Sequence, residues 1–179
     1  MKKLKDFTIQ FVGLKTGKHL FDYRINKAFF EDYGYDEVND IDVIAKVEFN
    51  KKETLLELNF NISGMVNVNC DLTNEPFEMA IDGSFDLVVN FGDDYNNENE
   101  EILIIPHGEY EINVAQYIYD LIVLSIPSKR IHPGVMDGTL QSDILDKLEE
   151  LSPKGKENKT TEDKTDPRWD TLKNLLTDK

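Results

Sequence analysis

Three long segments in the middle of the chain alternate apolar and polar side chains, and this period of two constrains the fold more than any other feature. The apolar series begin at Ile41, Leu56 and Phe77, and the positions between them carry mostly Asn, Asp, Glu and Lys. Because a β-strand points successive side chains to opposite faces, each segment is predicted to be a strand with one face in a core. Short turns between them favour an antiparallel meander or a partly closed barrel.

Smaller signals extend this sheet toward the N-terminus. Residues 7–12 and 19–25 have extended patterns around a turn at 13–17, which predicts a first hairpin, and Asn26 can cap a brief helix that Gly34 ends. Gly64 and Gly83 interrupt the second and third long strands, where each is predicted to mark a bend or bulge.

One main helix is predicted at about 113–126. Asn113 is a candidate N-cap, Gln116 follows three positions later as in a capping box, and Pro127 stops the helix. The segment is unusually apolar around its circumference, so we expect it to pack on the sheet and to offer a second apolar surface to a partner. The predicted fold class is therefore α+β.

The composition changes beyond Pro133. We expect a single α+β domain at 1–133, a charged linker with a short helix at 134–165, and a short amphipathic C-terminal helix at 166–179. In the last segment Asp166 can cap, Pro167 suits the first helical position, and Trp169 begins an apolar stripe.

The residues offer little to catalysis. The single cysteine, Cys70, could be a metal ligand or nucleophile, but its ordinary interpretation is a small buried residue, since the three histidines are scattered and no phosphate-binding glycine loop occurs. The acidic run at 93–101 lacks the order of a calcium loop and is predicted to be a mobile, solvated loop. We therefore expect no enzymatic activity, metal, cofactor or small-molecule substrate.

Charge and targeting signals limit the partners. The formal net charge of −15 disfavours wrapping along a phosphate backbone, and the absence of an apolar leader or a 20-residue apolar stretch predicts a soluble cytoplasmic protein without membrane contact. Positive charge is concentrated near the N-terminus, in a candidate basic patch made of Lys2, Lys3, Lys5, Lys15 and Lys18.

Two further groups are candidate interaction residues. Lys129, Arg130 and His132 follow the predicted helix, where they either pair with the helix dipole or form a small anion-binding patch, and both interpretations remain open. Arg and Trp are residue types that dominate interfaces, so Arg168 and Trp169 are candidates for contact with a partner. The alternative is that they belong to a helix that folds back on its own domain.

Several segments resemble the YceD family of large ribosomal RNA subunit accumulation proteins. The likeness lies in residues 113–122 with the exit through Pro127 to Pro133, in the strand and turn at 64–77 around Cys70, and in the closing segment from Asp166. Many family members carry a second cysteine three places after the first, and here that position is Thr73. A redox or metal role based on such a pair is therefore not expected in this chain.

The resemblance implies a non-enzymatic role in 23S ribosomal RNA accumulation or processing and in large-subunit biogenesis. Its expected partners are ribosomal RNA or ribosomal and assembly proteins, and the negative charge favours a basic protein. The alternative is a general protein-interaction adaptor unrelated to ribosomes.

Overall fold

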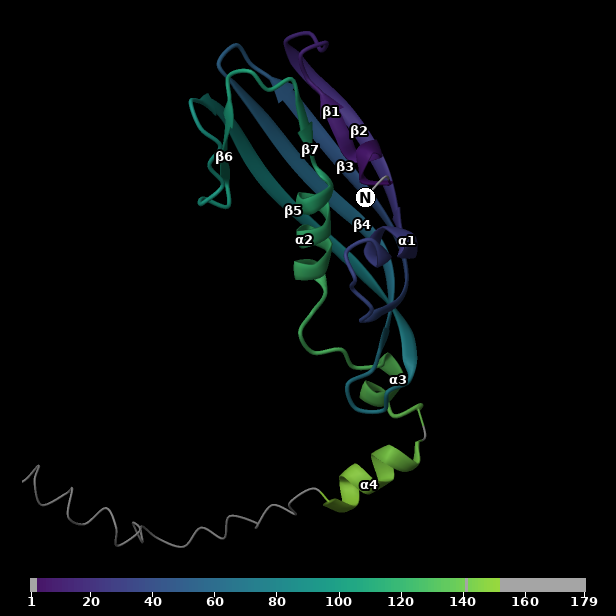
Figure 1. Ribbon diagram of the computed structural model, residues 1–179. Coiled ribbons are helices and arrows are strands. Elements are labelled where there is room, and N and C mark those ends of the chain that lie inside the picture. Colours follow the sequence, from purple (N-terminus) through teal and green to yellow (C-terminus); the bar gives the residue numbers. More distant parts are fainter. Residues whose placement is uncertain (1–2, 141, 152–179) are drawn as a thin grey trace, which may run out of the picture. The chain divides into compact units, whose positions relative to one another are not determined.

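A five-stranded sheet forms the centre of the computed structural model (Figure 1). Four long strands follow one another as an antiparallel meander, and a fifth, short strand adds in parallel to the last of them. The sheet is open, so the predicted meander is confirmed and the partly closed barrel is not formed. The strands are, in spatial order, β2 (Gly17–Asn26), β3 (Val38–Lys51), β4 (Leu55–Asn69), β5 (Pro76–Gly92) and β6 (Ile102–Pro106).

The predicted N-terminal hairpin is wrong. Strand β1 (Thr8–Gln10) pairs antiparallel with β7 (Glu111–Asn113) in a separate two-stranded sheet and not with β2. The side-chain amide of Asn113 donates to the Leu4 carbonyl at 2.8 Å and to the Thr8 hydroxyl at 2.9 Å, which fixes this junction. The strand that pairs with β1 therefore lies about a hundred residues away in the sequence, and the neighbouring β2 does not pair with it.

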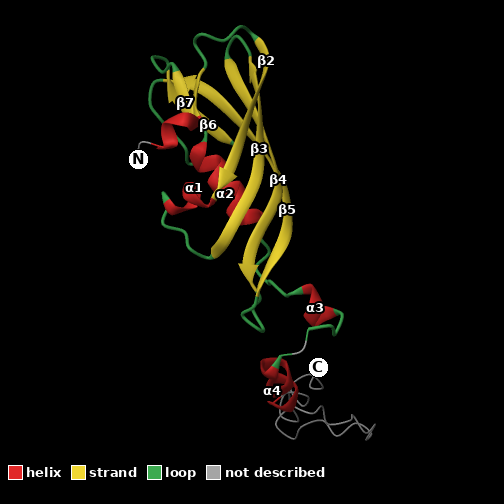
Figure 2. Cartoon of the chain, turned by 90° about the vertical axis from the view of Figure 1, so that its right-hand side faces the viewer, coloured by secondary structure: helices red, strands yellow, loops and turns green. Residues whose placement is uncertain are grey.

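Helices cover one face of the five-stranded sheet, which we call the inner face. Figure 2 shows α1 (Lys27–Glu31) and α2 (Ala115–Ser125) on the same side of strands β2–β5. Apolar side chains from every long strand are buried beneath these helices, together with Ile118 and Ile122 of α2. Burial of this apolar surface is the main stabilising contribution to the fold. Its largest fully buried members include Phe30, Phe49, Phe60, Leu56, Leu58 and Leu87.

The two strand glycines permit close approach and do not form bulges. Strand pairing runs through Gly64 and Gly83 without a shift in register, and the irregularity in the β3–β4 pairing lies between Val38 and Asp40. A Cβ at Gly64 would lie 2.6 Å from the Val43 Cα and closer still to a neighbouring carbonyl. A Cβ at Gly83 would collide with the Ser125 hydroxyl, so this glycine lets the end of α2 lie directly on the sheet.

The start of α2 differs from the predicted capping box. The N-cap position is Val114, and the Asn113 side-chain oxygen accepts a hydrogen bond from the Ala115 amide at 3.0 Å. Gln116 donates to Asp120 at 2.9 Å and does not reach back to Asn113. Asn113 is the last residue of β7, and its side chain also donates to the Leu4 carbonyl in η1 (Lys3–Phe7). The helix therefore begins one residue later than predicted, with Val114 as its N-cap.

The opposite, outer face of the sheet is polar. Asn39 of β3 donates to Asn67 and Asn69 of the neighbouring strand β4, and Lys18 pairs with Glu48 at 2.6 Å. Carboxylates outnumber cations on these strands. Its acidic side chains are Asp22, Asp40, Asp42, Glu48, Glu57, Glu78, Asp82 and Asp86, and its basic ones are Lys18, Arg24 and Lys46.

The structure describes residues 3–140 and 142–151, and the chain divides into a unit at Met1–Ser142 and a unit at Asp143–Lys179. The first unit also contains α3 (Pro133–Met136), and the described part of the second is α4 (Asp143–Leu151). The predicted C-terminal helix at 166–179 and the last part of the predicted linker, residues 152–165, lie outside the described residues. None of the described helices combines the length and apolarity needed to span a membrane.

Candidate functional site

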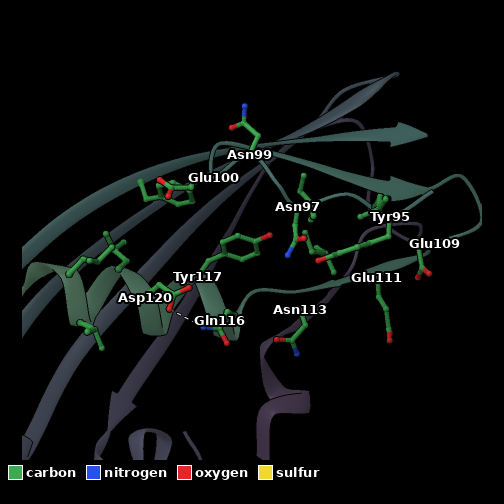
Figure 3. Close-up of a pocket in the computed structure, with 17 residues that line it drawn as sticks. Tyr95, Asn97, Asn99, Glu100, Glu109, Glu111, Asn113, Gln116, Tyr117 and Asp120 are labelled. Carbon is green, nitrogen blue, oxygen red and sulfur yellow. Dashed lines mark hydrogen bonds between the residues drawn. The ribbon is translucent and has the colours of Figure 1, made fainter. Parts of the chain in front are cut away.

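A groove of about 850 Å³ opens on the inner side of the sheet, beside helix α2 (Figure 3). One wall is α2, and the others come from β5, β6, the loop at 93–101 and the segment that leads through β7 into the helix. Its apolar lining residues are Phe85, Leu103, Ile105, Ile112, Leu121, Val123 and Leu124. The volume lies within the range of sites that hold a drug-sized ligand or a few side chains.

The groove lies beside α2, which packs on β4 and β5, and the buried side chains of Leu103 and Ile105 on β6 form the bottom of this space. Ile118 and Ile122 turn toward the sheet and are fully buried. Tyr117 and Leu121 line the groove instead, while Leu124 is 83% exposed at its edge. The side chains of α2 that do not face the sheet therefore form one wall of the groove.

The loop at 93–101 forms the other side of the opening. Asn96 and Ile104 exchange backbone hydrogen bonds of 3.0 and 2.8 Å, which folds the loop back along β6. The side chains of Asn96 and Asn99 accept hydrogen bonds from the Glu98 and Glu101 amides, so this polar segment has an ordered course. It contributes Tyr95, Asn97, Asn99 and Glu100 to the groove.

Negative charge surrounds the apolar floor. Figure 3 shows the carboxylates of Glu100, Glu109, Glu111 and Asp120 around the opening, and the lining residues include no Lys, Arg or His. Burial raises the pKa of Tyr117 to about 12, and Tyr95 and Asp120 contribute to this shift. A phenol in such surroundings stays neutral and can donate a hydrogen bond. The arrangement suits a ligand that is cationic at its edges and apolar at its centre.

The lining residues also limit the chemistry of the groove. They include no Ser, Thr, Cys, His or Lys, so the ionisable groups on this surface are four carboxylates and the phenols of Tyr95 and Tyr117. What remains is a set of carboxylates, amides and phenols above an apolar floor. Such groups orient and hold a partner by hydrogen bonds, charge and apolar contact.

A second cluster lies at the turn after β4, and it contains two predicted interaction residues. The Arg130 amide donates to the Asp71 carboxylate at 2.6 Å, and its guanidinium lies 3.5 Å from the carboxylates of Asp71 and Glu37. The ring of His132 accepts from the Gly134 amide at 2.9 Å and caps α3. These side chains thus hold the segment after α2 against the end of the sheet.

Cys70 is at the centre of this turn and is buried. Burial alone would raise the pKa of the Cys70 thiol, but hydrogen bonds from the His132 backbone, the Thr73 side chain and the Thr73 and Leu72 backbones together lower it to about 7. The distance from the His132 nitrogen to the Cys70 sulfur is 3.3 Å. Thr73 is therefore one of the residues whose hydrogen bonds favour the thiolate form of Cys70.

The other predicted residues do not converge with the groove. Lys129 is exposed beside Arg130, Lys5 lies in η1, and Lys15 lies in the turn before β2. Lys18 is on the outer face and is paired with Glu48. For Lys3 the structure gives only a backbone position in η1, and Lys2, Arg168 and Trp169 lie outside the described residues.

Of the rim carboxylates, the sequence pattern marks only Glu100, which belongs to the acidic run at 93–101. The signals of the groove were present separately, in the acidic run at 93–101 and in a helix too apolar to be covered by one sheet. Only the tertiary structure brings the loop, β7 and the helix together around one opening.

The fold and the groove define an α+β protein with an open sheet, one helix-covered face and a carboxylate-rimmed site beside the main helix. The chain belongs to the YceD family: the family described as large ribosomal RNA subunit accumulation protein YceD matches residues 58–176, more than half of the chain. Every residue lining the groove lies inside this span. Comparison with curated proteins and with solved structures gave no match.

Proposed function

We propose that this protein is a non-enzymatic, cytoplasmic factor for the accumulation or processing of 23S ribosomal RNA and for large-subunit biogenesis, and that it acts by binding a protein. Membership of the YceD family supports the ribosomal role. The observation that carries the mode of action is the groove itself, which offers an apolar floor and four carboxylates but no cation.

A protein partner fits this charge distribution better than RNA does. Affinity for a phosphate backbone comes mainly from Lys and Arg that displace counterions. Among the described candidate cations, Arg130 lies near two carboxylates and Lys18 is paired with Glu48. Ribosomal proteins are rich in the basic side chains that a carboxylate rim attracts, so the acidic domain is suited to them.

A deletion strain tests the ribosomal role. Loss of the gene should lower the level of mature 23S ribosomal RNA and the amount of unpaired large ribosomal subunits. The full chain supplied in trans should restore both quantities. Northern analysis and sucrose-gradient profiles measure these quantities, with 16S ribosomal RNA as the internal control. Normal 23S levels in the deletion strain would favour the alternative, a general interaction adaptor unrelated to ribosomes.

A salt series tests the choice of partner. Direct contact with phosphates predicts that affinity for 23S fragments falls steeply as salt rises. We expect instead weak binding to these fragments at every salt concentration. Tight, strongly salt-dependent binding, lost when Lys129 and Lys5 are changed to Gln, would show that RNA is the direct ligand.

A further inference from the structure

We propose that the groove beside α2 binds a Lys- and Arg-rich segment of a partner protein through one large apolar side chain, which enters the groove while flanking cations meet the rim. This inference deepens the proposed function, on which its ribosomal setting rests, by naming the chemistry of the occupant. It rests on the juxtaposition of an apolar floor, a rim of four carboxylates and the absence of any cation among the lining residues.

The floor accounts for the apolar part of the occupant. The half-buried Phe85 of β5 comes from the sheet, above the buried Leu103 of β6, and the half-buried Leu121 and the exposed Leu124 come from the helix. Apolar surface therefore lines the groove from two directions. Leu124 is 83% exposed and makes up the edge that a bound side chain would cover. Burying one large side chain here removes apolar surface of both partners from water.

The rim accounts for the cationic part. Glu109 and Glu111 precede the helix, Asp120 lies on it, and Glu100 approaches from the loop, so the carboxylates come from three different segments. Asp120 is held by Gln116 at 2.9 Å. Complementary charge at such a rim raises the association rate and selects against acidic partners.

Other occupants fit these observations less well. RNA would bring phosphates to a rim of carboxylates. A second copy of this chain would bring another protein of formal net charge −15 to an acidic rim. Addition of a β-strand at β6 is restricted because Asn96 already exchanges both backbone hydrogen bonds with Ile104. A basic segment that docks by its side chains satisfies the floor and the rim together.

Binding of defined peptides to the full chain tests the proposal. The probe is a fluorescein-labelled twelve-residue peptide of Lys, Arg and Ser with a central Trp, measured by anisotropy against a second peptide with Ala in place of Trp and a third with Glu in place of the cations. We expect the first peptide to bind at least about tenfold more tightly than the other two, because each of them lacks one half of the recognition. Equal binding of the Trp and Ala peptides would reduce the interaction to unspecific charge attraction and overturn the proposal.

Matched variants locate the binding. Leu124→Ser removes an exposed apolar edge with little risk to the fold, and Glu109→Gln with Glu111→Gln removes two rim charges. Each change should weaken the Trp peptide about tenfold. The control is Glu78→Gln with Asp82→Asn, which removes the same charge from the exposed side of β5 and should leave affinity within about twofold. If the control weakens binding as much as the rim variant, the groove is not the site.

The two levels of the hypothesis fail separately. Loss of 23S ribosomal RNA in the deletion strain without peptide binding at the groove would refute the occupant and leave the proposed function standing. Peptide binding that Leu124→Ser abolishes, with normal 23S levels in the deletion strain, would retain the groove and refute the ribosomal role.

Discussion

The two faces of the five-stranded sheet arise from the same alternation of side chains in the sequence, but different interactions stabilise them. On the inner face, side chains such as Phe60 and Val47 are buried under helices and pack against one another. On the outer face, their sequence neighbours Asn61 and Lys46 are exposed. The comparison teaches that apolar packing specifies the fold on one side, while the other side is free to carry charge.

The groove is the place where this division breaks down. It lies on the inner side beside α2, where the half-buried Phe85 and the buried Leu103 and Ile105 line an opening. Charged side chains from the loop and from β7 surround it. The opening therefore combines apolar surface with an acidic rim, a combination that the buried part of the inner face does not have.

The largest expected effect is on the inner face. Phe60→Ala should lower the free energy of unfolding by about 3–5 kcal/mol, because Phe60 is 1% exposed and its removal leaves a cavity. The adjacent outer-face change Asn61→Ala is the matched control and should stay within about 0.5 kcal/mol. Urea denaturation measures both. Similar losses for the two variants would remove the distinction between the faces.

The two inner-face glycines sharpen the comparison next. Gly64→Ala should destabilise by about 1–3 kcal/mol, because the added Cβ meets the backbone of β3, which cannot move without disturbing the sheet. Gly83→Ala should cost less, because its obstacles are the side chains of Ser125 and Leu121. Adding Ser125→Ala to Gly83→Ala should recover part of the loss. Equal losses for the two glycine variants, or no recovery, would contradict this difference.

Most of the sheet could be predicted from the sequence because alternation is a local signal. The meander of β3, β4 and β5 needed only the period of two and the turns between its strands. The pairing of β1 with β7 carries no such signal, since each strand has three residues and the two are separated by most of the domain. The parallel addition of β6 was likewise outside the reach of local patterns.

The candidate site was harder to predict because its residues come together only in the fold. Arg130 and His132 were singled out as charges after a helix, but their contacts at Asp71 and Cys70 are about sixty residues away in sequence. The groove combines a loop, a short strand and a helix, each unremarkable by itself. The sequence revealed the apolar excess of the helix and not what surrounds it.

The buried thiol of Cys70, which follows β4, provides a test at the end of the inner face. There the backbone of His132, in the segment after α2, contacts its sulfur. The pKa of Cys70 is lowered to about 7, so the fold favours the thiolate, and the stability it contributes is present at alkaline pH and lost as pH falls through 7. Between pH 6 and pH 8 the native chain should gain about 1 kcal/mol relative to Cys70→Ala. Urea titrations with a reductant at several pH values measure this slope. Thr73→Val removes a hydrogen-bond donor to the thiol and should make this pH dependence of stability weaker. Parallel slopes in the native chain, Cys70→Ala and Thr73→Val would refute the lowered pKa of Cys70.

The smallest expected effect is on the outer face. Arg24 donates two hydrogen bonds of 2.9 Å to Asp42, and this contact lowers the pKa of the Asp42 carboxyl. Both side chains are exposed, so solvent and salt screen the pair. Arg24→Gln should therefore return the Asp42 pKa to its ordinary range in an NMR titration while the thermal midpoint stays unchanged. A fall in the midpoint comparable to that of Phe60→Ala would mean that ion pairs on the outer face also specify the fold, and the two faces would then not differ in kind.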